Sequence, residues 1–237
     1  MFNKSLTSFR MAALGLAVAG SMMTTTQVMA EDAVEVAASA AVSSMYLWRG
    51  QDLGNGSPAI SGDVTVSTAG AYAGVWASSG DTAFGSEYDL YVGYGAEVEG
   101  FSFDVSLWNY NYANEPGTDG SDEELDTFGA LTDLVISLGF GPVTFTYYDN
   151  VAGSTGSEYY TLEAGYEKFS AKLGYSDTEA EDSDYTHLDL TYAYNDNLSF
   201  TVSKIVDNDG LSDNEDADGL NEDTLVMVSY SLPIDLK

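Results

Sequence analysis

The sequence lacks cysteine and contains few basic residues. Seven lysines and arginines stand against 38 aspartates and glutamates, and the formal net charge is −31. Without cysteine the chain forms no disulfide, no thiolate metal site and no catalytic thiol. Nucleic acids require clustered lysine or arginine on the protein that binds them, and the sequence has no such cluster. We therefore expect no nucleic acid partner.

A long apolar run is also missing. The longest apolar stretch, 11–23, follows Lys4 and Arg10 and precedes the small-residue site Val28-Met29-Ala30, a pattern typical of a secretory signal peptide. This stretch is too short for a transmembrane helix. We predict a signal peptide over 1–30 and a single domain over 31–237. Because the signal carries two basic and no acidic residues, its removal changes the net charge from −31 to −33.

The sequence is rich in tyrosine (17), phenylalanine (10) and glycine (24), which suits β-strands with aromatic girdles. Alternating apolar and polar residues predict strands at 37–49, 58–68, 71–79, 87–98, 101–112, 125–138, 143–150, 158–166, 169–177, 185–194, 198–206 and 224–232. Tight connections are expected at 69–70, 99–100, 139–142, 167–168 and 195–197. Long connections are expected near 50–57, 79–86, 113–124, 151–157, 177–184 and 207–223.

This alternation of tight and long connections predicts a closed barrel. Outer-membrane barrels have an even number of strands, short periplasmic turns and longer outer loops. Lipid leaves no backbone group unsatisfied, so a membrane-spanning sheet has to close on itself. We predict an all-β, antiparallel up-and-down transmembrane β-barrel of about 12 strands with acidic outer loops, located in the cell outer membrane of Gram-negative bacteria. A soluble β-sandwich also alternates apolar and polar residues, but it does not explain the alternating loop lengths.

The tight turns also predict strand registers. A two-residue turn at 99–100 places one apolar set outward and one polar set inward, and a slip of one residue would move polar side chains onto lipid. The outward pairs are Val98–Phe101, Ala96–Phe103, Tyr94–Val105 and Val92–Leu107, and the inward pairs are Glu97–Ser102, Gly95–Asp104, Tyr91–Trp108 and Asp89–Tyr110. The same reasoning pairs Val66–Ala73, Val64–Val75, Asp63–Trp76, Ser61–Ser78, Tyr166–Phe169, Tyr192–Phe200 and Leu190–Val202. It also predicts an ion pair between Glu163 and Lys172. For Lys204 two positions remain: outward beside Leu188, or inward if a bulge switches the faces of the strand there.

The outer loops hold much of the acidic charge. Eighteen of the 38 acidic residues fall in 119–126, 177–184 and 207–223. We interpret these loops as a solvated surface, with a cation-attracting vestibule or a surface linked to lipopolysaccharide through divalent ions as the alternatives. Residues 214–219 look like the start of a calcium loop and make Asp216 and Asp218 candidate ligands. However, Leu225 occupies the position that needs a bidentate glutamate, so no metal site is expected.

The register analysis gives a set of inward-facing residues that would line a pore. They are Arg49, Asp63, Trp76, Asp89, Tyr91, Asp104, Trp108, Tyr110, Asp133, Glu163, Lys172 and His187. Arg49 is placed at the outer mouth, with Tyr46 and Trp48 on the lipid face. It is either a constriction residue that orients a carboxylate or polarised oxygen, or one half of an ion pair with Asp52 or Asp89.

Several stretches resemble a known family. Residues 46–52 (YLWRGQD), 58–60 (PAI), 72–78 (YAGVWAS) and 87–94 (EYDLYVGY) are similar to the TorF-like porin family of proteobacterial outer-membrane proteins, formerly labelled conserved hypothetical. The resemblance is concentrated in residues 36–112. It implies a barrel and a porin associated with trimethylamine N-oxide respiration.

Three functions follow from these patterns. The first is a porin for passive diffusion of small neutral, zwitterionic or cationic solutes, because the predicted lumen is poor in basic residues. The second is a closed structural barrel, because twelve strands enclose a narrow lumen. The third is an outer-membrane enzyme with His187 at the mouth, although no nucleophile motif accompanies this single histidine. We predict no enzyme activity and no cofactor. The expected partners are outer-membrane lipid and lipopolysaccharide, the barrel-insertion machinery, a small-molecule solute and further copies of the chain in a homo-oligomer.

Overall fold

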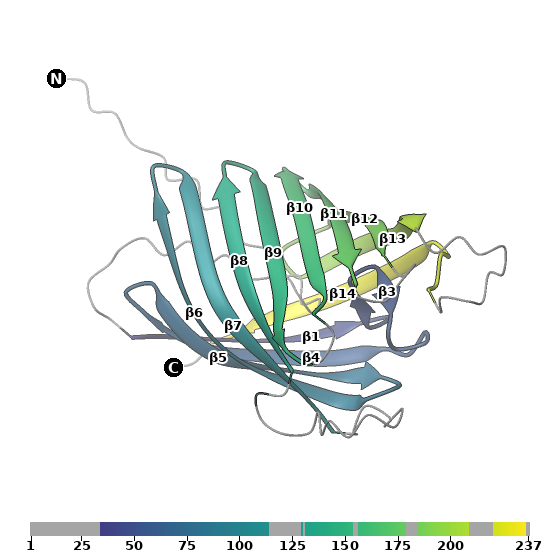
Figure 1. The fold of residues 1–237 in the computed structure, drawn as a ribbon, viewed down its shortest axis with the longest axis horizontal. Coiled ribbons are helices and arrows are strands. Elements are labelled where there is room, and N and C mark those ends of the chain that lie inside the picture. The colour runs from purple at the N-terminus through teal and green to yellow at the C-terminus, as the bar shows by residue number, and fades with distance from the viewer. Residues whose placement is uncertain are drawn as a thin grey trace.

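Twelve antiparallel strands form a closed barrel in a computed structural model (Figure 1). The structure describes residues 34–113, 129, 131–153, 156–178, 184–208 and 220–235. The barrel order is β1-β14-β13-β12-β11-β10-β9-β8-β7-β6-β5-β4, and β1 pairs with both β14 and β4. The barrel strands are β1 Glu35–Ser43, β4 Ala59–Thr68, β5 Ala71–Asp81, β6 Gly85–Val98, β7 Phe101–Tyr112, β8 Thr132–Phe140, β9 Val143–Ala152, β10 Glu158–Tyr166, β11 Phe169–Asp177, β12 Tyr185–Ala193, β13 Leu198–Asn208 and β14 Leu225–Ile234. The predicted all-β, up-and-down barrel is confirmed.

The two faces of each strand differ in chemistry. On β6 the outward Val92 is 55 % exposed, whereas Asp89 and Tyr91 on the inward face are buried. Each register predicted from the tight turns is observed, including Val92 opposite Leu107, Val64 opposite Val75 and Leu190 opposite Val202. The predicted lipid and lumen sets are therefore separated as expected from a period of two.

The tight turns lie together at one end of the barrel. Ala69 and Gly70 have φ values of 48° and 86°, and Glu99 and Gly100 have 53° and 81°. A two-residue hairpin turn with positive φ at both central positions matches the right-handed twist of the strands that it joins. The start of β1 and the end of β14 lie at this same end, because each strand reverses the direction of the one before it.

Two connections differ from the sequence prediction. The connection expected to be long at 79–86 is short, because β5 extends to Asp81 and β6 begins at Gly85. The carboxylate of Asp81 accepts hydrogen bonds from the backbone N–H groups of Ala83 and Phe84, each at 2.8 Å, and this closes the turn. The strand expected at 125–138 is observed as β8 up to Phe140, so Gly141 and Pro142 alone make the turn.

The first predicted strand is wrong at its C-terminal end. β1 ends at Ser43, and the chain then forms a small hairpin of β2 (Leu47–Trp48) and β3 (Gln51–Asp52) that is separate from the barrel sheet. Residues 46–57 are here called the inner hairpin. Tyr46 is buried and Trp48 half-buried in contact with inward-facing side chains, so neither lies on the lipid face.

Lys204 faces outward, which is the first of the two alternatives considered for it, and no bulge switches it inward. It pairs with Leu188 on the outward face, and its Nζ donates a hydrogen bond to the carbonyl oxygen of Glu222 at 3.2 Å. A register shift follows between Thr186 and His187, where Val206 is the extra residue of a bulge. The bulge lies beyond Ile205, which therefore keeps its regular place opposite His187 inside the barrel.

Some predicted features lie outside the described residues. These are the signal peptide at 1–30, the acidic segment 119–126, most of the acidic loops 177–184 and 207–223, and the calcium-like segment with Asp216 and Asp218. No helix long and apolar enough to cross a membrane occurs among the described residues.

Candidate functional site

The inner hairpin enters the barrel at the end opposite the tight turns. Arg49 and Gly50 form its tip, with φ values of 46° and 82°. This is the geometry of the Ala69-Gly70 and Glu99-Gly100 turns, so the local sequence X-Gly explains the tip. A hydrogen bond from the N–H of Leu53 to the carbonyl of Tyr46, at 2.9 Å, closes the base of the hairpin.

Apolar contacts hold two sides of the inner hairpin. Tyr46 packs with Ala59, Trp76 and Tyr91 of the β4–β6 wall, and Trp48 lies against this cluster. On another side Leu47 packs against Leu225 and Met227 of β14. The hairpin therefore contacts barrel strands on both sides of the β1 seam.

A polar contact adds to the apolar support of Tyr46. Its hydroxyl donates a hydrogen bond to the carboxylate of Glu87 on β6. Burial raises the pKa of the Tyr46 hydroxyl, and the charge of Glu87 raises it further, so this hydroxyl stays protonated and remains a donor. The contact ties the base of the hairpin to the wall near the mouth.

Arg49 at the tip lies in an aromatic cage. Its Nη2 donates a hydrogen bond to Asp133 on β8 at 3.0 Å. The guanidinium carbon lies 4.2 Å from the ring centroid of Trp48, 4.5 Å from that of Tyr159 and 5.3 Å from that of Tyr148. Burial opposes the charge of Arg49, but the nearby Tyr110 and Asp133 outweigh this effect and raise its pKa, so Arg49 stays a cation. The expectation that Asp52 or Asp89 would pair with Arg49 is wrong, and Asp52 instead accepts hydrogen bonds from the N–H groups of Gly54 and Gly56.

His187 on β12 supports the tip from the same wall as Tyr159. It is 0 % exposed; Nδ1 lies 2.9 Å from Oδ1 of Asp189, and Nε2 lies 2.7 Å from the hydroxyl of Tyr159. The same Oδ1 accepts a hydrogen bond from Ser203 at 2.6 Å. A Cβ on Gly50 would lie only 2.6 Å from Cγ of His187, so glycine is required where the tip meets this ring.

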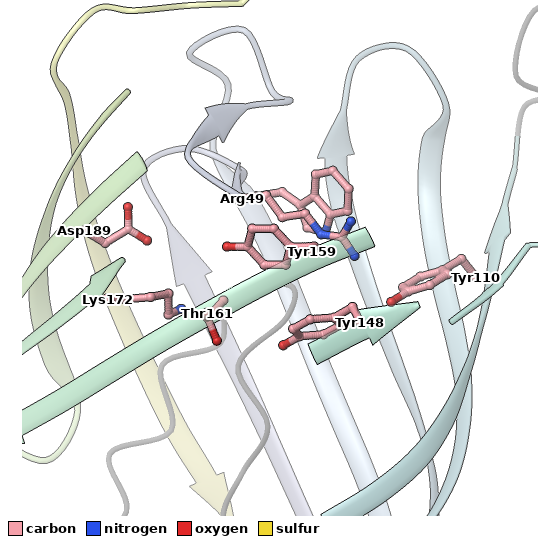
Figure 2. A pocket seen from close by; sticks show the side chains of 8 residues that line it. Arg49, Tyr110, Tyr148, Tyr159, Thr161, Lys172 and Asp189 are labelled. Atoms are coloured by element: carbon pink, nitrogen blue, oxygen red, sulfur yellow. The ribbon is translucent and has the colours of Figure 1, made fainter. Parts of the chain in front are cut away.

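A small cavity lies beside the tip. Its volume is about 20 Å³, and it is lined by Trp48, Arg49, Tyr110, Tyr148, Tyr159, Thr161, Lys172 and Asp189 (Figure 2). A cavity of this size holds roughly one water molecule. The lining brings residues of the inner hairpin together with residues from β7, β9, β10, β11 and β12.

The wall formed by β4 to β7 carries carboxylates that accept hydrogen bonds from tyrosines. Tyr91 donates to Asp63 at 2.6 Å, and Tyr72 donates to Asp104 at 2.8 Å. Asp89 is 2 % exposed, and its Oδ1 has no hydrogen-bond partner. Tyr91 also stacks on Trp108, with ring centroids 4.3 Å apart. This wall is therefore polar but densely filled by rings.

Lys172 has the predicted register partner but not the predicted ion pair. It lies opposite Glu163 in the β10–β11 register, as expected. Among the described residues Arg49 forms an ion pair with Asp133, and neither Glu163 nor Lys172 takes part in one, so the predicted ion pair between Glu163 and Lys172 is not formed.

The structure places all twelve residues of the predicted lumen set on the inner side of the barrel. It brings Arg49, Tyr110, Lys172 and His187 around the hairpin tip, with Asp133 as the ion-pair partner of Arg49. Asp63, Tyr91 and Asp104 belong to the β4–β7 wall instead. Sequence reasoning missed Tyr148 and Tyr159, which are register partners on β9 and β10. Their strand parity was the available signal, but nothing in the sequence indicated that an arginine would reach them.

The chain matches one known family over most of its length. The sequence model of a family described as "Bacterial protein of unknown function (Gcw_chp)" matches residues 27–216. The chain belongs to this family. The Gcw_chp match includes the inner hairpin and the barrel strands from β1 to β13, whereas β14 lies beyond it. No curated protein matches the chain.

Proposed function

We propose that this Gcw_chp protein is an outer-membrane barrel of Gram-negative bacteria that lets small solutes diffuse through its lumen. The observation that carries the proposal is the separation of the two faces. Exposed apolar side chains occupy the outward face of the barrel strands, while the inward face is polar and tyrosine-rich. An apolar belt around a polar interior is what lipid on one side and solute on the other require.

The inner hairpin is the constriction in this proposal. It reduces the space beside Arg49 to a cavity of about 20 Å³. The described inward face bears Asp63, Asp89, Asp104, Asp133 and Glu163 but few basic residues. Such a lumen favours small neutral, zwitterionic or cationic solutes over anions. The resemblance to the TorF-like porin family is compatible with trimethylamine N-oxide, which is small and zwitterionic, as one candidate.

A closed structural barrel is the second candidate, and the filled lumen favours it. The hairpin contacts Trp76 on one wall, Asp133 and Tyr159 on another, and Met227 beside the seam. If the hairpin never leaves this position, it obstructs the lumen permanently and the barrel conducts no solute.

Liposome swelling separates the two candidates. We would compare the full-length mature protein with a variant in which residues 45–57 are replaced by a short glycine-serine linker, using sugars of graded size. A porin gives size-limited flux in both proteins, with a higher limit in the variant. Flux in the variant alone would support the closed barrel, and an absence of flux in both correctly folded proteins would refute the porin proposal.

The remaining expectations belong to the same proposal. The hydrogen-bonded set of Asp189, His187 and Tyr159 could serve an enzyme, but the fully buried histidine has both ring nitrogens engaged, and we propose a structural role and no enzyme activity. The proposed partners are outer-membrane lipid, lipopolysaccharide, the barrel-insertion machinery, the solute and further copies of the chain in a homo-oligomer. His187→Gln should lower the free energy of unfolding, because glutamine does not keep both hydrogen bonds of the ring, and unchanged stability would contradict the structural role.

A further inference from the structure

Both inward-facing cations of the described chain line one cavity. Lys168 donates to the carbonyl of Tyr194 at the tight-turn end, and Lys204 points outward. The other two described basic residues are Arg49 and Lys172, and both line the cavity beside the hairpin tip. In an acidic barrel, this places the inward positive charge at a single point.

Lys172 is available to a ligand there. It is half-buried, and within the described ranges its ammonium group has no hydrogen bond or ion pair. Arg49 uses Nη2 for Asp133, and a guanidinium has five N–H donors in a planar fork. Two cations that share a cavity form a site for a carboxylate group.

A negative group lines the same cavity. Asp189 is the register partner of Lys172 on β12, and Figure 2 shows both side chains at one side of the cavity. The hydrogen bonds that Asp189 receives from His187 and Ser203 both end on Oδ1. Its Oδ2 is therefore open to a cationic group. Tyr148 and Tyr159 complete the lining, and their rings hold the guanidinium of Arg49 in place.

We propose that this cavity is a binding site for small zwitterions of the amino acid type, and the proposal rests on the proposed function as a solute pore. The carboxylate of the ligand binds Arg49 and Lys172, and its ammonium group binds Oδ2 of Asp189. Because the cavity holds roughly one water molecule, a ligand of this type enters only if the flexible Lys172 stem moves aside. Glycine is the smallest such zwitterion and requires the smallest movement.

Equilibrium binding in detergent micelles tests the site without requiring flux. The probes are glycine, acetate and methylammonium, each followed by ligand-observed NMR on the refolded barrel. We expect glycine to bind more tightly than either single-charge probe. Lys172→Met should weaken glycine binding about tenfold or more, which is the loss of one charge-assisted hydrogen bond. The matched control Lys204→Met changes an outward lysine and should leave binding unchanged.

A second variant tests the negative end. Asp189→Asn keeps an oxygen for His187 and Ser203 but removes the charge, so glycine binding should weaken and acetate binding should tighten. Equal binding of glycine and acetate by the unmodified protein, or glycine binding that Lys172→Met leaves intact, would overturn the proposal. Liposome flux is measured separately. Glycine flux with no binding effect of Lys172→Met refutes the site and leaves the pore, whereas binding without flux of any solute refutes the pore function.

Discussion

Replacement of Gly50 by alanine should displace the tip of the inner hairpin. A Cβ at this position would lie 2.6 Å from Cγ and 2.7 Å from Cβ of His187. These two atoms join the imidazole ring to the backbone. The His187 side chain is 0 % exposed and both ring nitrogens are in hydrogen bonds, so the ring has no room to move. The hairpin must therefore yield, and with it the position of Arg49.

The cost has two parts that a control can separate. Gly50 has a φ of +82°, where an alanine costs about 1–2 kcal/mol. Overpacking against His187 adds roughly 1–3 kcal/mol. Gly56 lies in the same hairpin with a φ of +77°, and no atom lies within 4 Å of the position that its Cβ would occupy. Gly56→Ala therefore carries the backbone cost alone, and the difference between the two variants measures the contact with His187.

Urea unfolding in detergent micelles, followed by tryptophan fluorescence, measures this difference. Trp48 is on the hairpin, and Trp76 and Trp108 pack near it, so the signal reports the region of interest. We expect Gly50→Ala to be less stable than Gly56→Ala by roughly 1–3 kcal/mol. Equal destabilisation of the two variants would mean that the tip does not rest on His187, and the hairpin would have to be placed elsewhere in the lumen.

Three further changes test other contacts. Asp133→Ala leaves Arg49 without its ion-pair partner and should lower the free energy of unfolding by about 3–5 kcal/mol in the same urea assay, with Asp133→Asn less affected; equal effects of the two would argue against a charge interaction. Tyr46→Phe removes the donor to Glu87 and should cost about 1.5–3 kcal/mol, whereas a neutral effect would show that the base of the hairpin is held by packing alone. Val92 lies in the middle of β6 on the outward face, and Val92→Arg should lower the free energy of unfolding from a bilayer by about 2–4 kcal/mol. A change within about 0.5 kcal/mol is typical of an exposed site in water and would contradict membrane embedding.

The barrel was predictable because its turns and its faces carry independent signals. An X-Gly pair such as Glu99-Gly100 fixes the turn, and the turn fixes the register of the strands on either side. A register error would place Asp104 on the apolar outward face, so the side-chain pattern checks the turn. The short connection after Asp81 escaped prediction because an aspartate that caps a turn looks the same in the sequence as one in an acidic loop.

The inner hairpin escaped prediction for a different reason. Tyr46 and Trp48 alternate with other residues as they would on a lipid-facing strand, and a ring packed inside the barrel gives the same period. Arg49-Gly50 has the form of the other X-Gly turns, which was the signal available. The pairing of Arg49 with Asp133 joins residues 84 positions apart across the lumen, and strand registers alone do not measure distances through the interior.

The closure of β1 on β14 brings the inner hairpin against the last strand of the chain. The inner hairpin directly follows β1, the first strand of the chain, whereas Leu225 and Met227, which pack on Leu47, belong to the last strand. The contacts of Leu47 with Leu225 and Met227 therefore form only when the first and last strands of the chain come together. Contacts between the two ends of a chain form slowly. A hairpin that sits correctly therefore gives the last strand an apolar surface to join, and the interior residues help to determine when the barrel can close.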